Sequence, residues 1–584
     1  MVPKPSLGFL GALSLVLRVV SGESDDIERT QPDQASARER AHMVFNAIHS
    51  AGRQWGSSLY HNGFGFFPAI VPQGTLFYHG ARQNVTPTGP EWLAFEIEHA
   101  ENFAPSFRAT PGDGRPRPPP PGKQPEGWKP MPEPEEPRQE LRRRREHGPN
   151  GDDDGRRHGP GDGRRHGPGD GDDDDQPRNY RGYLHTYQAK RDLKLLLIDG
   201  MSAGKTAMGT LDSQDLVLRE NTTKHNDGVW DEWARALDLC DIATEWGYDG
   251  LVRVEIGFEV IQCNFTTSLN LVSMTRTEMM ENTIGMRQLA PFQWARAAGE
   301  RYNDIGGDRL RIDFSSMVSG LFMPINISST DAKRPDLMRL GAADLDDLKD
   351  LKVYLKDVAT SPRRFTVNWQ RLVDLIVSRY SKRLATMIYE PLPSKHFINE
   401  IEAATLTWFD ALPLPDDVSV AESEKNRTAD AIERCMKHYL RPALVTAERW
   451  SLEDDLIYTS IDTVMGHVCR DLFSVRNLLL EASGSTSNGY KVNEEAGDED
   501  KLEDAVKAGR AILRQLVDTL GWTTWKQTQP CSPDEVLFIA MWPFGEEDDH
   551  WNPGCRTIDQ VQHPSSSYWR GWGHPPRPKP SDEA

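Results

Sequence analysis

The sequence predicts an α+β protein: a mixed α/β N-terminal part, interrupted by a disordered insert, and a mainly helical C-terminal part. Three observations carry this prediction. Runs rich in β-branched and aromatic residues occur between about residues 40 and 330. From about residue 345 onward, apolar residues recur at helical spacing. The stretch 105–179 is rich in Pro, Gly, Asp and Arg and has almost no apolar residues to bury, so it should be disordered.

Residues 1–22 have the pattern of a cleavable signal peptide. Lys4 gives a basic start, Leu7–Val20 form an apolar run, and Val20-Ser21-Gly22 fits a small-residue cleavage site. The run is too short to span a bilayer core of about 30 Å. No later segment is long and apolar enough for a membrane helix, and the polar end HPPRPKPSDEA is unlike the hydrophobic tail of a GPI signal. We therefore expect a secreted protein, extracellular or cell-wall-associated, without a membrane span.

Cysteines and glycosylation sequons favour the same destination. An even number of cysteines in an exported chain predicts disulfides, and six allow 15 pairings. Sequential pairing is our preferred guess, because short loops close readily. The candidate disulfide residues are Cys240, Cys263, Cys435, Cys469, Cys531 and Cys555. The candidate N-glycosylation sites are Asn84, Asn221, Asn264, Asn326 and Asn426.

The α/β part contains alternating strand-like and helix-like segments. GTLFYHG at Gly74–Gly80 reads as a strand, and Glu91–Ala104 reads as a helix. Leu193–Ile198 and Leu251–Phe265 are β-rich, with a helical pattern between them at Gly228–Cys240. Because such segments lie on both sides of the insert, we expect the insert to split one folded unit. The predicted segments are a signal peptide (1–22), the two parts of the α/β domain (23–104 and 180–340) around the insert (105–179), a helical domain with a disulfide-rich end (341–560) and a disordered Pro-rich tail (561–584).

The clearest predicted helix begins after Ser451. Ser451 and Asp454 have the spacing of a capping box, in which each side chain bonds the other's backbone N–H. One helical face then carries the apolar residues Ile457, Ile461, Val464, Val468, Leu472, Val475 and Leu479. Weaker helical patterns cover Thr366–Ala385, Thr428–Leu440 and Lys501–Leu520.

The segment GMSAGKT at Gly200–Thr206 follows a strand and approaches a phosphate-binding loop. Such a loop needs G-x-x-x-x-G-K-[ST], so that backbone N–H groups surround the phosphates. Here the glycines enclose one residue too few, and Asp199 holds the place of the first glycine, where a carboxylate would repel phosphate. A strand-to-helix turn with Lys205 exposed is the favoured interpretation.

A second arrangement is spread over the α/β part. His79 ends a strand, an aromatic segment follows, and Glu259 lies within a later strand. This order resembles ADP-ribosyltransferase-like folds. The resemblance implies that His79 would bind a nicotinamide ribose, that Phe95 or Phe103 would stack on the ring, and that Glu259 would orient the attacking group. The alternative is that His79 is structural.

Other kinds of chemistry find little support. The sequence has no G-x-S-x-G, H-E-x-x-H or C-x-x-C motif. Asp548, Asp549 and His550 cluster beside Trp551, where a solvated turn is favoured over a metal site. The net charge of −20 argues against nucleic-acid partners. We predict no cofactor and no metal ion.

Four runs together resemble a fungal family of uncharacterised secreted proteins. They are GTLFYHG, LKLLLIDGMSAGKTAMGTLDSQD, YDGLVRVEIGFEVIQCNF and DEVLFIAMWPFGEEDDHWNPGC. The resemblance implies a signal peptide, cysteines around the last two runs and no assigned activity. The first hypothesis is therefore a secreted glycoprotein that binds or supports other molecules at the cell surface, with cell-wall components as candidate partners. The alternative is a secreted enzyme on an ADP-ribosyltransferase-like core, acting on NAD or a related nucleotide.

Overall fold

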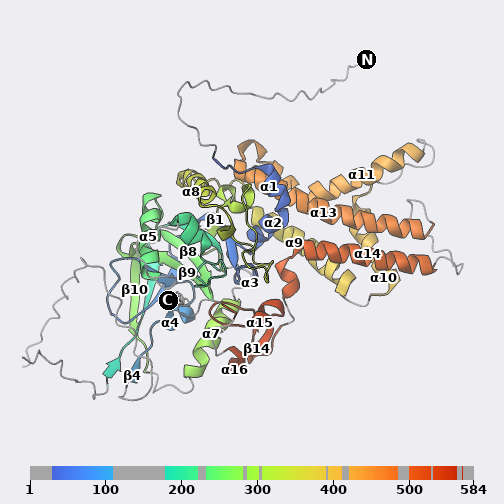
Figure 1. Ribbon diagram of the computed structural model, residues 1–584. Coiled ribbons are helices and arrows are strands. Elements are labelled where there is room, and N and C mark those ends of the chain that lie inside the picture. Colours follow the sequence, from blue (N-terminus) through green and yellow to red (C-terminus); the bar gives the residue numbers. More distant parts are fainter. Residues whose placement is uncertain are drawn as a thin grey trace, which may run out of the picture.

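The predicted arrangement of a sheet-containing part followed by a helical part is confirmed in a computed structural model (Figure 1). The predicted signal peptide, most of the insert, Asn221 and most of the tail lie outside the residues that the structure describes. Those residues are 29–109, 178–220, 232–279, 286–300, 305–389, 392–410, 420–484, 499–527, 530–561 and 568–569.

One ten-stranded sheet forms the N-terminal part. Its order is β10-β6-β2-β3-β9-β8-β7-β1-β11, and β12 also pairs with β1. All neighbouring strands are antiparallel except β7 and β8, whose parallel pairing needs a crossover connection. The strands are β1 (Asn62–Val71), β2 (Leu76–Ala81), β3 (Glu91–Ala94), β6 (Tyr183–Ala189), β7 (Leu193–Gly200), β8 (Gly250–Glu255), β9 (Gly257–Gln262), β10 (Leu269–Arg276), β11 (Arg311–Ile312) and β12 (Val318–Ser319).

The insert interrupts this sheet without dividing it. β2 precedes the insert in the sequence. It pairs with β3, which also precedes the insert, and with β6, which follows the insert. The chain leaves through β4 (Phe107–Ala109) and returns through β5 (Arg178–Tyr180), and these two strands pair with each other. Ala109 lies opposite Arg178, so the two ends of the segment between them meet at one point.

The expected helix at Glu91–Ala104 is wrong in its first half. Residues 91–94 form β3, and only Ile97–Glu101 form a helix, α4. The reason is pairing: β3 is held between β2 and β9, with Ala94 opposite both Tyr78 and Glu259. Short helices and turns around the sheet are α3 (Gln54–Leu59), η1 (Ser213–Leu218), α5 (Glu232–Glu245), α6 (Phe265–Ser268), α7 (Met286–Glu300), η4 (Phe314–Ser316), η5 (Gly320–Phe322) and η6 (Leu340–Ala342).

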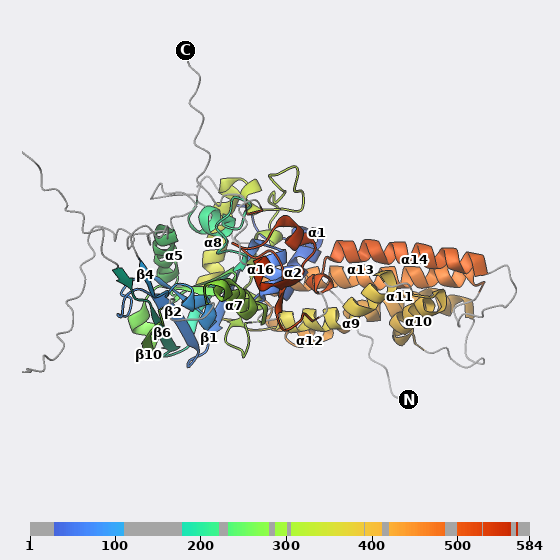
Figure 2. The same cartoon turned by 90° about the horizontal axis from the view of Figure 1, so that it is seen from below.

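Long helices form the second part and extend from the sheet (Figure 2). The capping box at Ser451 is confirmed, and the seven predicted apolar residues of that helix are all buried. α13 and α14 lie side by side in this part. The helices are α8 (Leu345–Thr360), α9 (Trp369–Tyr389), α10 (Ser394–Thr405), η7 (Leu406–Trp408), α11 (Val420–His438), α12 (Arg441–Leu444), η8 (Ala447–Arg449), α13 (Leu452–Ala482) and α14 (Glu499–Leu520).

The first and last described elements each pack on the part of the molecule that is more distant from them in the sequence. The first helices, α1 (Gln34–Glu39) and α2 (Ala41–Ser50), pack on α13. The last segment packs instead against α7, beside the sheet (Figure 1). One hydrophobic core runs from Ala37 through the sheet to Trp522, so the two parts share their interior. The last segment comprises η9 (Thr523–Lys526), β13 (Glu535–Phe538), α15 (Glu547–Trp551), β14 (Gly554–Thr557) and α16 (Ile558–Val561).

The six cysteines form three disulfides in sequential order. Cys240 pairs with Cys263, Cys435 with Cys469, and Cys531 with Cys555, which confirms the preferred pairing. None of the helices in the described ranges combines the length and apolar character that crossing a bilayer requires.

Candidate functional site

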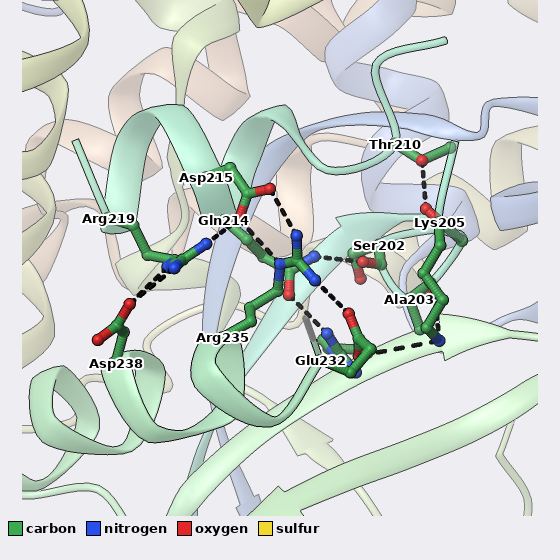
Figure 3. Close-up of polar contacts among 12 residues, drawn as sticks. Ser202, Ala203, Lys205, Thr210, Gln214, Asp215, Arg219, Glu232, Arg235 and Asp238 are labelled. Atoms are coloured by element: carbon green, nitrogen blue, oxygen red, sulfur yellow. Dashed lines mark hydrogen bonds and ion pairs between the residues drawn. The ribbon is translucent and has the colours of Figure 1, made fainter. Parts of the chain in front are cut away.

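A buried network of charged side chains lies on one face of the sheet (Figure 3). Lys205 belongs to it: its Nζ lies 3.3 Å from Oε2 of Glu255 and 3.8 Å from Oε2 of Glu232. The expectation of an exposed Lys205 is therefore wrong, since only 12% of this side chain is accessible. The loop turns inward because the backbone N–H of Ala203 donates to the carbonyl of Val254. Two carboxylates neutralise Lys205, so it is not free to bind phosphate.

Arg253 is the centre of this network. Its guanidinium is fully buried and donates to Glu259 Oε1 at 2.9 Å, to Glu232 Oε2 at 2.7 Å and to Gln214 Oε1 at 2.8 Å. Burial opposes the ionisation of Glu232, but Arg253 and Lys205 outweigh it and hold the pKa of Glu232 below its ordinary value. The network is thus charge-paired within the protein.

The same pairing continues outward from the sheet to α5 and η1. Asp215 accepts from Arg219 at 2.9 Å and from Arg235 at 2.8 Å, and Asp238 accepts from Arg219 at 2.7 Å (Figure 3). These bonds tie η1 to α5 across the crossover between β7 and β8. The contacts give the network a structural role.

Three members of this region have donor atoms close enough to share a cation. One ligand atom each from His99, Glu255 and Glu259 lie within 4.8 Å of one another. Lys205 and Arg253 already contact these two carboxylates, so side chains supply the positive charge that a metal would bring. We assign no metal to this cluster.

Strands β2 and β9 carry the candidate residues His79 and Glu259 and lie on either side of β3, but the two side chains do not meet. Tyr78 pairs with Ala94, which pairs with Glu259, so these three share a face. His79 follows Tyr78, and successive strand residues point to opposite faces. The contacts agree with this alternation: Glu259 bonds Arg253, whereas His79 Nδ1 lies 2.8 Å from the carbonyl of Trp92.

The aromatic candidates lie elsewhere. The Phe95 ring packs edge-on against Phe77 in the core, with centroids 5.1 Å apart. Phe103 is 54% exposed and lies near His99 and Trp294. Neither ring therefore stands between His79 and Glu259.

A cavity of about 460 Å³ lies where the sheet, the first helices and the C-terminal segment meet. We call it the central cavity. Ligand pockets in proteins commonly have volumes of this order and combine apolar walls with a few polar groups. Its aromatic lining residues are Tyr60, Phe64, Tyr389, Trp522, Trp525 and Trp551, and its titratable ones are His42, His61, Asp199, Asp336, Asp518, Lys526 and His550.

Two glycines bring β1 and β7 together at the cavity wall. A Cβ atom on Gly200 would lie 2.4 Å from the backbone nitrogen of Gly63, and one on Gly63 would lie 2.0 Å from the carbonyl oxygen of Asp199. Gly200 also has φ +68°, which favours glycine. This close approach places Asp199, at the end of a buried strand, in the lining.

Asp199 is a carboxylate without a cation. Its carboxylate accepts from the backbone N–H groups of Phe64 and Gly200, and burial raises its pKa to about 6. Within the described ranges it forms no ion pair. Strongly shifted carboxyl groups in pockets are candidates for functional residues.

His61 and His550 stack on one another in the wall, with ring centroids 5.0 Å apart. His61 Nε2 lies 3.0 Å from the Tyr568 hydroxyl. Burial lowers the pKa of His550 to about 4 and holds that of His61 well below its ordinary value, so both rings are neutral at pH 7. The expected solvated turn is wrong for His550, which is only 4% exposed; Asp549 bonds Arg556, and Asp548 is exposed.

Several polar atoms on lining residues have no partner among the described residues. A buried polar atom without a partner costs free energy and calls for water or a ligand. They are Asn46 Oδ1, Ser50 Oγ, Asn62 Oδ1, Trp522 Nε1 and His550 Nδ1.

Comparisons with known proteins agree with the predicted resemblance at a coarse level. Residues 35–291 match the family model described as the YPL277C N-terminal domain. The uncharacterized protein YOR389W of Saccharomyces cerevisiae is 27% identical over 580 residues, covering 88% of this chain and 84% of that protein. The uncharacterized protein YPL277C of the same yeast is 34% identical over 251 residues, covering 42% of this chain and 44% of that protein. The comparisons support an uncharacterised fungal family. No solved structure matches.

The family-model match contains part of each site. Lys205, Glu259, His61 and Asp199 lie within residues 35–291, whereas His550 lies beyond them. Sequence reasoning missed the central cavity because its wall comes from segments far apart in the chain. One signal was available: Asp199 is a charged residue directly after the buried run LKLLLI.

Proposed function

We propose that this protein is an exported glycoprotein that binds a small ligand in the central cavity without a catalytic step. The observation that carries the proposal is the cavity itself, with exposed aromatic rings and an unpaired Asp199 in one lining. The charge-paired network around Arg253 lacks a free group of this kind. Binding proteins need a preformed, partly apolar pocket with a few oriented polar groups.

Export is supported by the three disulfides, because such bonds persist mainly in oxidising compartments. Asn84, Asn264 and Asn326 are exposed, as glycan acceptors must be. We expect secreted protein from yeast culture to lose mass on endoglycosidase treatment and to yield the three sequential disulfides by non-reducing peptide mapping. Six free thiols would contradict export.

A fragment screen by ligand-observed NMR tests binding. We expect fragments to bind the wild-type protein and to lose affinity in Trp551→Ala, whose side chain is 40% exposed at the cavity. Trp233→Ala is the matched control, since Trp233 is 37% exposed but packs on Trp92 beside the sheet. Fragments that bind both variants equally would exclude the cavity as their site.

The second candidate is an NAD-consuming enzyme. Strands β2, β3 and β9 are adjacent, but His79 and Glu259 point to opposite faces and Glu259 is paired with Arg253, so the geometry argues against this candidate. If the protein had this activity, wild-type protein should hydrolyse NAD, and Glu259→Gln should be slower. Equal rates in the two proteins would remove Glu259 from any mechanism.

A further inference from the structure

We propose that the ligand of the central cavity is a neutral carbohydrate, whose CH faces pack on the aromatic rim and whose hydroxyl groups bond Asp199 and its polar neighbours. This inference rests on the binding role proposed above and adds the chemical class of the ligand. It is argued from the rim, the interior and the charge of the cavity.

Exposed aromatic side chains gather at the cavity rim. Six aromatic residues in the described part of the chain are more than one third exposed, and three of them line the cavity: Tyr60 at 42%, Tyr389 at 61% and Trp551 at 40%. All three are Tyr or Trp, whose rings offer an apolar face and a polar edge. A sugar ring is amphipathic in the same way, because its axial CH groups form an apolar patch and its hydroxyls project from the edge.

The interior offers hydrogen bonds of both directions. Asp199 and the unpartnered amide oxygens of Asn46 and Asn62 can accept bonds, whereas the unpartnered Ser50 Oγ and Trp522 Nε1 can donate them. A hydroxyl group both donates and accepts, so it suits such a mixed set. A wholly apolar ligand would leave Asp199 and these oxygens without bonds, at a cost in affinity.

The charge of the lining disfavours an anion. Asp336 in the lining is paired with Arg334, and of the remaining charged groups the carboxylates of Asp199 and Asp518 face a single lysine, Lys526. His61 and His550 add no charge at pH 7, because burial keeps them neutral. Phosphorylated or carboxylated ligands would meet repulsion there, and the net charge of −20 adds to it.

Asp199→Asn separates a binding role from a structural one. The buried carboxylate is ionised at neutral pH without a cation, so its removal should stabilise the folded protein. If Asp199 contacts sugar hydroxyls, the same variant should lose affinity, because charge-assisted bonds become neutral ones. A purely structural Asp199 would give the opposite pattern: lower stability and unchanged binding.

Isothermal titration at pH 7 with gluco-, manno- and chito-oligosaccharides tests the proposal. We expect at least one of these to bind, and its affinity to fall about tenfold or more in both Trp551→Ala and Asp199→Asn. Trp233→Ala, which alters an exposed ring away from the cavity, should bind as wild type. Melting curves of each variant establish that it is folded.

Other outcomes overturn the proposal in distinguishable ways. If fragments occupy the cavity but no oligosaccharide binds, the carbohydrate class falls and the binding role stands. If tetramethylammonium binds in an Asp199-dependent manner and the sugars do not, the ligand is a cation. If neither fragments nor sugars respond to Trp551→Ala, both proposals fall.

Discussion

At the scale of single residues, Asp199 and Arg253 illustrate two fates of a buried charge. Among the described residues, Asp199 accepts only from backbone N–H groups, whereas Arg253 contacts two carboxylates and a glutamine. Burial of a charge is costly unless partners compensate it. Neutralising Asp199 should therefore raise the stability of the folded protein, whereas neutralising Arg253 should lower it.

Asp199→Asn should make the protein more stable at pH 7. The folded-state pKa of about 6 exceeds the ordinary 3.8, so the folded protein holds a proton that the unfolded chain has released between these values. Stability of the wild type should thus fall as pH rises from about 4 to about 6 and then level off. The variant should lack this slope and gain up to about 3 kcal/mol at pH 7.

Denaturant unfolding between pH 4 and pH 8 measures this difference. Asp336→Asn is the control, because Asp336 also lines the cavity but is paired with Arg334 at 2.8 Å. That variant should show no gain. Parallel pH profiles of wild type and Asp199→Asn would contradict the argument.

Arg253→Met should destabilise the protein by about 3–5 kcal/mol, because it leaves Glu259 buried without its ion-pair partner and removes one of the cations that contact Glu232. Arg191→Met is the matched control. Arg191 bonds Asp249 at 2.7 Å but is 51% exposed, so its loss should cost less than about 1 kcal/mol. Similar urea midpoints for the two variants would refute a stabilising role for the network.

The burial of Lys205 and the place of Asp199 in a cavity wall could not be predicted from the sequence. The spacing of GMSAGKT departs from that of a phosphate-binding loop, but the burial of Lys205 cannot be predicted from this segment. The partners of Lys205 are distant in sequence: Glu232 begins α5 and Glu255 ends β8. The same holds for His61 and His550, which meet from opposite ends of the chain.

At the scale of elements, the β1–β7 contact depends on a missing side chain at Gly200. Gly200→Ala should be far more harmful than Gly247→Ala, although both glycines have positive φ. A Cβ at Gly247 meets nothing within 4 Å, so only backbone strain of about 1–2 kcal/mol applies there. At Gly200 the clash with Gly63 should add at least about 2 kcal/mol more.

Thermal and chemical unfolding of both variants provide the measurement. Failure of Gly200→Ala to fold, with a folded Gly247→Ala, would agree with the expectation. Equal losses would show that the two strands can separate at this point without cost.

Elements were predictable where the signal is local. α13 was found because Ser451, Asp454 and seven apolar residues define its start and its face within one segment. β3 was mistaken for a helix because the residues that make it a strand, in β2 and β9, are remote. The sequential disulfides followed from short loops, which is again local information.

At the scale of the whole molecule, all strand pairings of the ten-stranded sheet are made by residues outside 110–177. Ala109 and Arg178 are opposite one another in β4 and β5, so a two-residue Asn-Gly turn can join them. The shortened protein should keep the melting temperature of the full chain within a few degrees. A loss of about 10 °C or more would show that the segment contributes to the fold.

The order of parts was predictable from composition, but the packing between their distant elements was not. Helices α1 and α2 pack on α13, although in the sequence all strands of the large sheet lie between them and that helix. Nothing within residues 34–50 indicates that partner, because an amphipathic helix specifies an apolar surface and not its identity. The central cavity exists only through this packing, since α2 and α15 both contribute to its wall.

The packing of α2 on α13 also determines when α2 can reach its native position during translation. α2 leaves the ribosome about 400 residues before α13, and at about 5–20 residues per second this delay is roughly 20–80 s. Val44, Phe45 and Ile48 lack their helical partners until α9 and then α13 have been translated. The first helices of this protein therefore reach their native place only after most of the chain has been translated.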